Sequence, residues 1–299
     1  DKHPNYENNA IITKFTTTNK AIAVVKVQHH EAHFAAILGE KKLWDSDKKI
    51  VGVIWDGIGF GTESEIYGGE FLEYHDRKIN RVGHLDYFSW ILGDTMSKNP
   101  KISALSISNN DLFFKNYFDE NEWKVYTKLI KEGTIKTASM GRLFDAVAFV
   151  LGFKNSISFE GEAGMYVEKL AKEALSSTYS LSDYLEHETI TDGIPTKKLF
   201  QKIIESIQTN DSLQAIALNF HFTLVKCIEK VATNCEATEL AFSGGVFQNT
   251  VLIDLIINNL KYQPFPMVIL NILNHDGALL FIKFVPFIRR NSTDISIYY

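Results

Sequence analysis

The sequence has few cysteines, no excess of basic residues and neither a tandem repeat nor a low-complexity linker. Its two cysteines, Cys227 and Cys235, fall in a helical pattern and match neither a CxxC metal pair nor a disulfide framework. We therefore expect reduced thiols and a cytoplasmic protein. The 31 Lys and Arg against 36 Asp and Glu give a net charge of −5, without a basic block that would neutralise many phosphates. This balance argues against nucleic-acid binding.

The ends of the sequence lack the patterns of targeting and membrane segments. DKHPNYENN is polar, without the apolar stretch typical of a signal peptide. Residues 267–288 are strongly apolar, but Asn271, Asn274, His275 and Asp276 interrupt them, whereas a bilayer span needs about 20 uninterrupted apolar residues. We expect a buried strand and a helix there, and no membrane contact. Because the sequence does not begin with Met, we also expect a piece of a longer protein or a processed chain.

The apolar residues follow strand and helix periods in alternation, around a helical middle. With 299 residues, 45% of them hydrophobic, the chain can bury a substantial core in one large or two smaller domains. Strands, glycine turns and helices in this order predict a layered α/β domain with ligands at the strand ends. The predicted elements are a strand at 21–27, a helix at 29–42, a hairpin at 51–74, helices over 97–131, 139–152 and 196–235 with a break near Thr209 and Asn210, a strand before a glycine turn at 244–245, a helix at 249–262 and a strand at 266–272.

The histidines of HHEAH have the spacing of a metal site. In a helix, His29 and His33 project from one face about a turn apart, so that two imidazoles can share one ion. Surface or capping histidines beside His30 are the alternative. Asp276, which ends an apolar strand, is the best candidate for a third ligand, with a turn or helix cap as its alternative. Two imidazoles and one carboxylate suit Fe(II) or Zn(II) equally.

Gly57, Gly59 and Gly61 take alternate positions in DGIGFG, which we place in a hairpin turn. Their backbone amides can then approach phosphate oxygens without obstruction by a Cβ atom, although a plain turn explains them as well. The motif is neither a Walker loop nor a GxGxxG that opens a helix. Asp56, at the strand end, is expected to hydrogen-bond a reacting amide or to hold a metal-bound water, or else to bond its own backbone.

Two further glycine turns are candidate ligand contacts. In SGGVFQN, Gly244 and Gly245 separate a strand from an apolar helix and allow close approach of a ligand, while Asn249 can contact the ligand or cap the helix. A plain Gly-Gly turn is the alternative. In SFEGEAG, Glu160 stands beside Gly161, which suggests a ligand contact without defining it.

Asp145 of GRLFDAVAFVLG is an acid among core residues, where a charge is costly without a partner. A ribose hydroxyl and Arg142 are equally good candidates for that partner.

Taken together, these motifs resemble the C-terminal, Kae-like domain of the HypF family of hydrogenase-maturation carbamoyltransferases. The resemblance runs from the DKHPNY start to about Gly277, and the motifs occur in the order of the family. They are VQHHEAH at 27–33, WDGIGFG at 55–61, YGGEF at 67–71, SMGRLFDAVAFVLG at 139–152, FEGEAG at 159–164 and SGGVFQN at 243–249.

The resemblance implies an actin/hexokinase/Hsp70-like α/β fold of two ribonuclease H-like lobes with the nucleotide between them. It places the end of a truncated first lobe, with the HxxxH helix, at 1–50 and a second lobe with a helical insertion at 51–299. It also implies a metal, Fe or Zn, held by His29, His33 and Asp276, and Mg²⁺ as a further candidate with the nucleotide.

The activity implied by the resemblance is carbamoyl transfer. In the family, an adenylate-forming module makes carbamoyl adenylate from carbamoyl phosphate and ATP, and the Kae-like domain passes the carbamoyl group to the C-terminal cysteine of the partner HypE. The product leads to the cyanide ligand of [NiFe]-hydrogenases. Asp56, His29 and His33 take catalytic roles, and no cysteine of this chain is needed. Similarity assigns Gly57, Gly59 and Gly61 to phosphates, Asp145, Glu160 and Gly161 to the ribose, and Gly244, Gly245 and Asn249 to the adenosine.

The chain also departs from the family pattern. NHDGALLFIKFVPFIRR replaces a line that usually begins NDGG, so we expect an altered final helix, with His275 either adding a ligand or packing. Asn99 and Lys101 stand where an acid and an arginine are usual. Residue 1 aligns inside the Kae-like domain, so the opening strands of the first lobe and the acylphosphatase-like, zinc-finger and adenylate-forming modules are absent from this sequence.

Three alternatives remain at this point. The tRNA threonylcarbamoyl transferases carry a different HxxxH context and an SGG loop in place of DGxGxG. The O-carbamoyltransferases act on a small-molecule hydroxyl. A noncatalytic nucleotide-binding or scaffold domain is the third, and binding of ATP or metal without transfer would identify it.

Overall fold

A computed structural model defines the fold. It describes residues 27–61, 65–109, 112–154, 156–175 and 179–260, the single positions 12, 14 and 17, and the backbone of 268–272 and 280–284. The strand predicted at 21–27, except for its last residue, and the predicted ligand Asp276 with its neighbour His275 lie outside the described residues.

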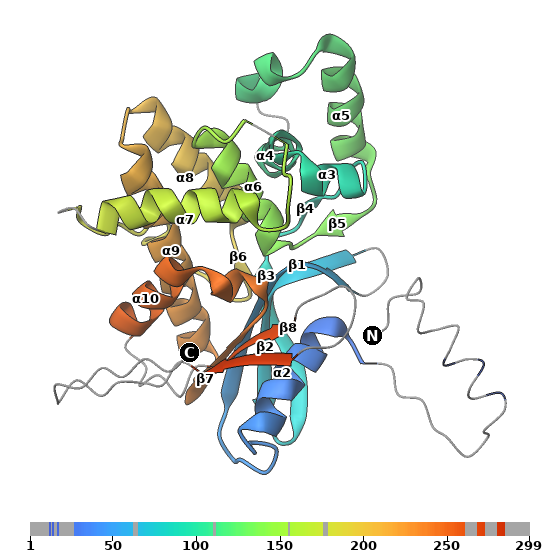
Figure 1. Cartoon of the computed structure of the whole chain (residues 1–299), viewed down its shortest axis with the longest axis vertical. Coiled ribbons are helices and arrows are strands. Elements are labelled where there is room, and N and C mark those ends of the chain that lie inside the picture. The colour runs from blue at the N-terminus through green and yellow to red at the C-terminus, as the bar shows by residue number, and fades with distance from the viewer. Residues whose placement is uncertain are drawn as a thin grey trace.

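Nine strands of the described chain form one mixed sheet (Figure 1). β1 pairs antiparallel with β2 and parallel with β7, and β8 lies parallel to β7. β1 is paired on both sides over Ile50–Ile54, and beyond Ile54 it extends past the end of β7 and pairs with β2. The strands are β1 (Ile50–Phe60), β2 (Glu65–His75), β3 (Lys78–Leu85), β4 (Phe88–Ser89), β5 (Lys136–Thr137), β6 (Gly193–Ile194), β7 (Glu239–Ser243), β8 (Val268–Ile272) and β9 (Leu280–Phe284).

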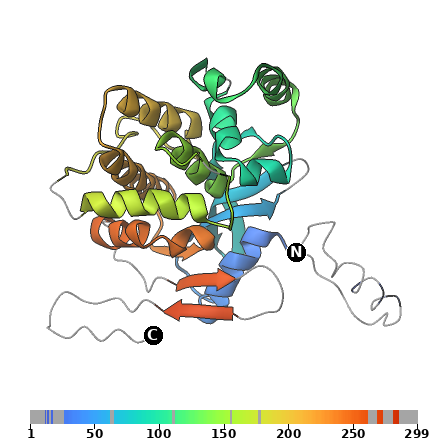
Figure 2. The same cartoon turned by 45° about the horizontal axis from the view of Figure 1, so that its top comes forward.

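Helices cover the two faces of the sheet unequally. One helix, α2, lies against one face, and the helical segments between β4 and β8 gather over the other (Figures 1 and 2). The helices are α2 (His29–Glu40), α3 (Asp94–Lys98), α4 (Pro100–Ser108), α5 (Glu120–Glu132), α6 (Met140–Val150), α7 (Glu162–Leu175), α8 (Thr196–Gln208), α9 (Leu213–Asn234) and α10 (Thr250–Asn259), with short 3₁₀ turns η1 (Leu112–Tyr117) and η2 (Gly245–Gln248).

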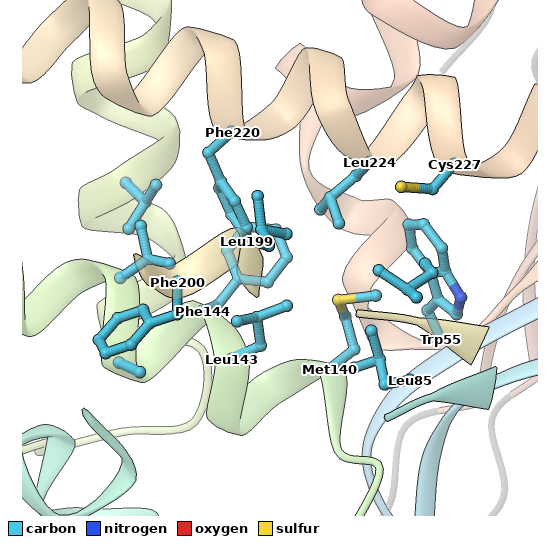
Figure 3. Packing of buried hydrophobic residues seen from close by; sticks show 14 of the residues in the cluster. Trp55, Leu85, Met140, Leu143, Phe144, Leu199, Phe200, Phe220, Leu224 and Cys227 are labelled. Carbon is cyan, nitrogen blue, oxygen red and sulfur yellow. The ribbon is translucent and has the colours of Figure 1, made fainter. Parts of the chain in front are cut away.

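The larger core lies between the sheet and the helical layer. Trp55 of β1 stacks on Phe247 at 5.6 Å and meets Phe71 of β2 edge-on at 5.8 Å. Figure 3 shows side chains of α6, α8 and α9 packed against one another, among them Leu143 and Phe220, with Cys227 of α9 above the Trp55 ring. These contacts hold the helical insertion and the central strands in one cluster, so the end of β1 has a rigid support.

The smaller core fixes α2 on the opposite face. Phe34, Ile37 and Leu38 are buried there, in a cluster that includes Ile54 of β1. Burial of each such side chain is worth about 1.5–3 kcal/mol. Gly52 makes the contact possible, since a Cβ atom at that position would lie 2.7 Å from the Phe34 ring.

Most of the predicted helices and strands are confirmed. α2, the α8–α9 pair with its break after Gln208, and β8 occur where the periodicity placed them. Two predictions are wrong. DGIGFG is not a turn, because Asp56–Phe60 belong to β1 and a bulge between Trp55 and Gly59 carries the irregularity. The apolar segment after β8 contains strand β9 where a helix was expected, and its alternating LFIKF pairs antiparallel with β8.

Among the described helices, none combines the length and apolar character that crossing a bilayer requires.

Candidate metal and ligand site

The start of α2 is positioned by Gln28. Its Oε1 accepts hydrogen bonds from the His30 and Glu31 amides at 2.7 and 3.1 Å and caps the helix, while its Nε2 donates to the Phe60 carbonyl at 2.9 Å. One side chain therefore ties the first turn of α2 to the end of β1. The buried face of α2 fixes the rotation of the helix, so that His29 and His33 face the carboxyl end of β1.

His29, His33 and Asp56 converge on one point. The two histidine Nε2 atoms are 3.2 Å apart, and each lies near Asp56 Oδ2, at 3.7 Å from His29 and 3.8 Å from His33. One ligand atom from each residue lies within 4.8 Å of the other two. Asp56 Oδ1 accepts the Gly57 amide at 2.8 Å, which leaves Oδ2 directed at the histidines.

The charges of this cluster suit cation binding. Burial lowers the pKa of His33 to about 4, helped by His29 and opposed by Asp56, so its imidazole is neutral at pH 7. Burial by itself raises the pKa of Asp56, but the interactions with His29 and His33 and the hydrogen bond from the Gly57 amide together hold it below its usual value. Neutral imidazoles and an ionised carboxylate are the forms that bind a divalent metal.

Ser243 orients His33 from the end of the neighbouring strand β7. Its Oγ lies 2.9 Å from His33 Nδ1. When Nδ1–H donates to that oxygen, the lone pair of Nε2 points at the cluster. A second contact that fixes the ring of a ligand is typical of metal sites, and the donor set therefore fits the divalent metal that the sequence predicted. Asp56, predicted as a substrate or water contact, lies among the ligand atoms themselves.

The SGG turn lies directly against this cluster. Gly244 has φ 108°, and a Cβ atom there would lie 2.1 Å from the Trp55 carbonyl oxygen, so only glycine fits. A Cβ atom on Gly245 would lie 3.3 Å from Asp56 Oδ1. Since β1 and β7 are parallel and pair at Ile54 and Ser243, β7 ends beside the Asp56 segment of β1, and the carboxyl ends of strands are where α/β sheets bind ligands.

The three glycines of DGIGFG are not equivalent. A Cβ atom on Gly59 would lie 2.2 Å from His30 Cε1, and one on Gly61 would lie 2.5 Å from the Glu65 carbonyl oxygen. Packing within the protein therefore accounts for glycine at both positions. At Gly57 the nearest atom of the described residues to such a Cβ is Glu160 Oε1, at 4.0 Å, so within the described chain Gly57 has open space beside Glu160.

The start of α6 lies beside Gly57. Ser139 caps α6 through the Arg142 amide at 3.1 Å, and its hydroxyl also donates to the Gly57 carbonyl. A Cβ atom on Gly141 would lie 2.9 Å from Gly57 Cα. Gly161, with φ 83°, has no atom of the described residues within 4 Å of its Cβ position. Glu160, whose Oε1 would lie 4.0 Å from a Cβ atom on Gly57, places the FEGEAG turn beside the same segment of β1.

Arg142, one of the two candidate partners of Asp145 in the sequence, lies beside it in the structure. Asp145 Oδ2 lies 2.7 Å from Arg142 Nε, but neither atom makes a well-aligned hydrogen bond among the described residues. Burial raises the pKa of Asp145 to about 7, against the opposing charge of Arg142. This buried carboxylate and guanidinium retain hydrogen-bonding capacity for a ligand hydroxyl.

Asn249 is bound within the protein. Its Oδ1 accepts the Leu252 amide at 2.9 Å as the N-cap of α10, and its Nδ2 lies 2.8 Å from Nε2 of the buried His221. His221 Nδ1 lies 2.7 Å from the Ala217 carbonyl oxygen. Both ends of the Asn249 amide are therefore engaged, and the capping role is the one observed.

Sequence reasoning missed Gln28, Ser139 and Ser243 as positioning residues. All three lie within the quoted motifs, but a capping or orienting role depends on partners that are distant in the sequence, such as Phe60 for Gln28.

The chain is similar to known proteins over most of its length. Residues 52–280 match the family model described as "Carbamoyltransferase, Kae1-like Domain, second subdomain", and residues 1–40 match "HypF Kae1-like domain". The chain is 30% identical to carbamoyltransferase HypF of Synechocystis sp., over 93% of this chain and 38% of that protein.

Two solved structures are also similar to the chain. HypF of T. kodakarensis has a TM-score of 0.73 and 26% identity, over 88% of this chain and 36% of that one. A full-length HypF in a phosphate- and nucleotide-bound form has a TM-score of 0.69 and 28% identity, over 83% and 34%. The chain therefore spans less than two fifths of the length of these relatives.

Proposed function

Because the chain belongs to the HypF carbamoyltransferase family, as its Kae1-like domain, we propose that it carries the transfer half-reaction of that family. The fold is the mixed α/β, actin/hexokinase-like fold of the HypF structures. Within it we propose a division near residue 50, between the end of a first lobe and a second lobe with the helical insertion. The two family models, which match on either side of residues 41–51, support this division.

The proposed reaction moves a carbamoyl group from carbamoyl adenylate to the C-terminal cysteine of a HypE-type acceptor, for cyanide synthesis in [NiFe]-hydrogenase maturation. The thiolate sulfur forms a bond to the carbamoyl carbon, the bond from that carbon to the phosphate oxygen breaks, and AMP leaves with the electron pair. The observation that carries the proposal is the convergence of His29, His33 and Asp56 beside the open space at Gly57.

In this proposal some of the site residues bind the metal ion and others contact the nucleotide. His29, His33 and Asp56 would hold a divalent metal, with Asp276 as a further candidate ligand. A bound Fe or Zn supplies Lewis acidity toward a phosphate or carbonyl oxygen. The space at Gly57 admits a phosphate.

The nucleotide contacts come from the neighbouring turns. Glu160, Gly161 and Asp145 face the ribose in this proposal. Gly244 and Gly245 let the nucleotide approach the end of β7, and Asn249 supports that turn from behind.

Neither cysteine of the chain has an activated thiol, which supports a nucleophile that comes from the acceptor. Cys227 is buried, and burial raises the pKa of its thiol far above neutral pH. Burial also raises the pKa of Cys235. A thiol becomes a nucleophile as its thiolate, so neither group is activated in this chain, and an acceptor must bring its own.

The test combines metal analysis with transfer. Protein purified without chelators is assayed for Fe and Zn, as the wild type and as a double variant, His29→Ala with His33→Ala. We expect near-stoichiometric metal in the wild type and its loss in the double variant. We also expect the wild type to transfer radiolabelled carbamoyl from supplied carbamoyl adenylate to a HypE-type acceptor. Metal or ATP binding without transfer to that acceptor would favour the noncatalytic scaffold. Transfer to a small-molecule hydroxyl in place of a thiol would favour an O-carbamoyltransferase.

A further inference from the structure

Glu70 and Arg81 form a buried ion pair beside the candidate site. The Glu70 side chain is fully buried, and its Oε2 accepts Arg81 Nε at 2.5 Å while its Oε1 accepts the Gly68 amide at 3.2 Å. Glu70 shares its face of β2 with Leu72, which packs in the α2 cluster. Removing both charges from water costs several kcal/mol, so such a pair contributes little net stability. What it does provide is a fixed orientation of the guanidinium.

The Arg81 guanidinium is held by two aromatic rings as well. Its Cζ lies 4.0 Å from the centre of the Tyr67 ring and 5.6 Å from that of Tyr87. The Tyr87 hydroxyl is itself anchored by Glu65 Oε2 at 2.9 Å. The Arg81 side chain keeps 26% of its surface exposed, so a ligand can reach the exposed part of the side chain but not the buried Nη2 atom without a rearrangement.

One nitrogen of this fixed guanidinium has no partner. Nη2 is buried and donates to no atom of the described residues. Leaving a buried donor unpaired costs about 1–3 kcal/mol, and more when the group is charged. The orientation imposed by Glu70 therefore holds a charged donor ready for an acceptor that the described protein does not provide.

The pair adjoins the metal cluster on two sides. The Tyr67 ring on which Arg81 stacks lies 6.1 Å, centre to centre, from the ring of His30, which in turn lies 5.3 Å from the ring of His29. The Gly68 amide that Glu70 binds belongs to a residue packed on the Asp56 carbonyl, where a Cβ atom would approach to 2.8 Å. An anion at Arg81 would thus be separated from the proposed metal ligands by the rings of Tyr67 and His30.

We propose that Arg81 is a substrate-binding residue that receives an oxyanion at the edge of the His29, His33 and Asp56 cluster, with Glu70 as its positioning residue. The inference rests on the proposed function for the identity of the substrates. Two substrates carry a suitable group: the adenylate has a phosphate, and an acceptor that ends in cysteine has a terminal carboxylate beside its thiol. Arginine binds both anions by charged hydrogen bonds.

The main variant is Arg81→Lys. Lysine keeps the charge that pairs with Glu70, but it replaces the planar guanidinium fork by one nitrogen, which cannot hold Glu70 and also present a second nitrogen to a ligand. Because the Arg81 environment is tight, a second variant, Glu70→Gln with Arg81→Gln, removes both charges together and avoids an unpaired buried carboxylate. Arg77→Lys is the matched control, since Arg77 also pairs with an acid, Asp45, at 2.8 Å, but is exposed.

Two binding differences identify the anion. The first is the affinity for AMP relative to adenosine. The second is the affinity for a short peptide that ends in cysteine with a free carboxylate relative to the same peptide amidated. We expect one of these two affinity ratios to fall about tenfold or more in Arg81→Lys and in the double variant. Neither affinity ratio should change in Arg77→Lys.

A smaller AMP preference assigns Arg81 to the phosphate, and a smaller carboxylate preference assigns it to the acceptor. The inference is overturned if the wild type shows neither preference, or if both survive unchanged in folded Arg81 variants, in which case water satisfies Nη2. Failure of the proposed function would be recognised separately, as absence of metal and of carbamoyl transfer with these binding differences intact.

Discussion

His33 Nδ1 lies 2.9 Å from Ser243 Oγ, although 210 residues separate the two in the sequence. The contact joins the α2 helix, which carries the histidines, to the turn after β7. It also sets the direction of His33 Nε2 toward His29 and Asp56. Metal binding and the geometry of the SGG turn should therefore depend on each other.

Ser243→Ala should weaken metal binding about 10- to 100-fold while leaving all three candidate ligands in place, because a hydrogen bond that orients a ligand has effects of this size. The measurement is Zn²⁺ affinity by competition with a chelating dye. Ser97→Ala, whose hydroxyl only bonds the Asp94 carbonyl within α3, is the control. Equal Zn²⁺ affinity in wild type and Ser243→Ala would show that α2 holds His33 without help.

Asp56→Asn should lower Zn²⁺ affinity because it removes the ionised oxygen near both histidine Nε2 atoms. The amide can still accept the Gly57 hydrogen bond, so the loop should keep its shape. Asp45→Asn changes charge equally at an exposed ion pair and serves as control. If Asp56→Asn retains full affinity, the carboxylate acts on substrate or water, as the sequence first suggested.

The elements with strong periodicity were predictable, and the contacts between them were not. The apolar faces of α2, α8 and α9 repeat at helical intervals, and Thr209 and Asn210 mark the break between the last two. The bulge that turns DGIGFG into part of β1 depends on the pairing of β1 with β2, which no local pattern reveals. LFIKF in β9 is apolar and short, so its pattern fits strand and helix alike.

The site was predictable in its parts and less so in their roles. HHEAH and SGGVFQN located the residues that the structure brings together. The roles of Asp145 and Asn249 were left open, since each has one partner within the protein and one candidate outside it. The structure supplies the protein partner in both cases, Arg142 for Asp145 and His221 with the α10 amide for Asn249.

His221 should make the fold sensitive to mild acid. Burial lowers its pKa from 6.5 to about 4, despite the raising effects of the Ala217 carbonyl and the Glu168 charge. Between those two values the unfolded chain binds more protons than the folded one, so stability falls as pH decreases, and His221 should account for about 1 kcal/mol between pH 7 and 5.5. His30 and His33, whose pKa values are also lowered by burial, act in the same direction.

Urea unfolding at the two pH values measures this effect. His221→Gln should lose less stability on acidification than the wild type, whatever its stability at pH 7. His187→Gln, a change at an exposed histidine, should follow the wild type. An unchanged acid loss in His221→Gln would mean that His221 is protonated in the folded protein.

Gly57 and Gly59 should respond to alanine in opposite ways. A Cβ atom at Gly59 would meet the buried His30 ring at 2.2 Å, so Gly59→Ala should cost about 1–3 kcal/mol of stability. At Gly57 the nearest atom would be 4.0 Å away, so Gly57→Ala should unfold at nearly the wild-type temperature. If phosphate occupies that space, however, the added methyl group must weaken AMP binding. Thermal unfolding and AMP titration of both variants separate the two effects, and a Gly57→Ala protein that binds AMP as the wild type does would place the phosphate elsewhere.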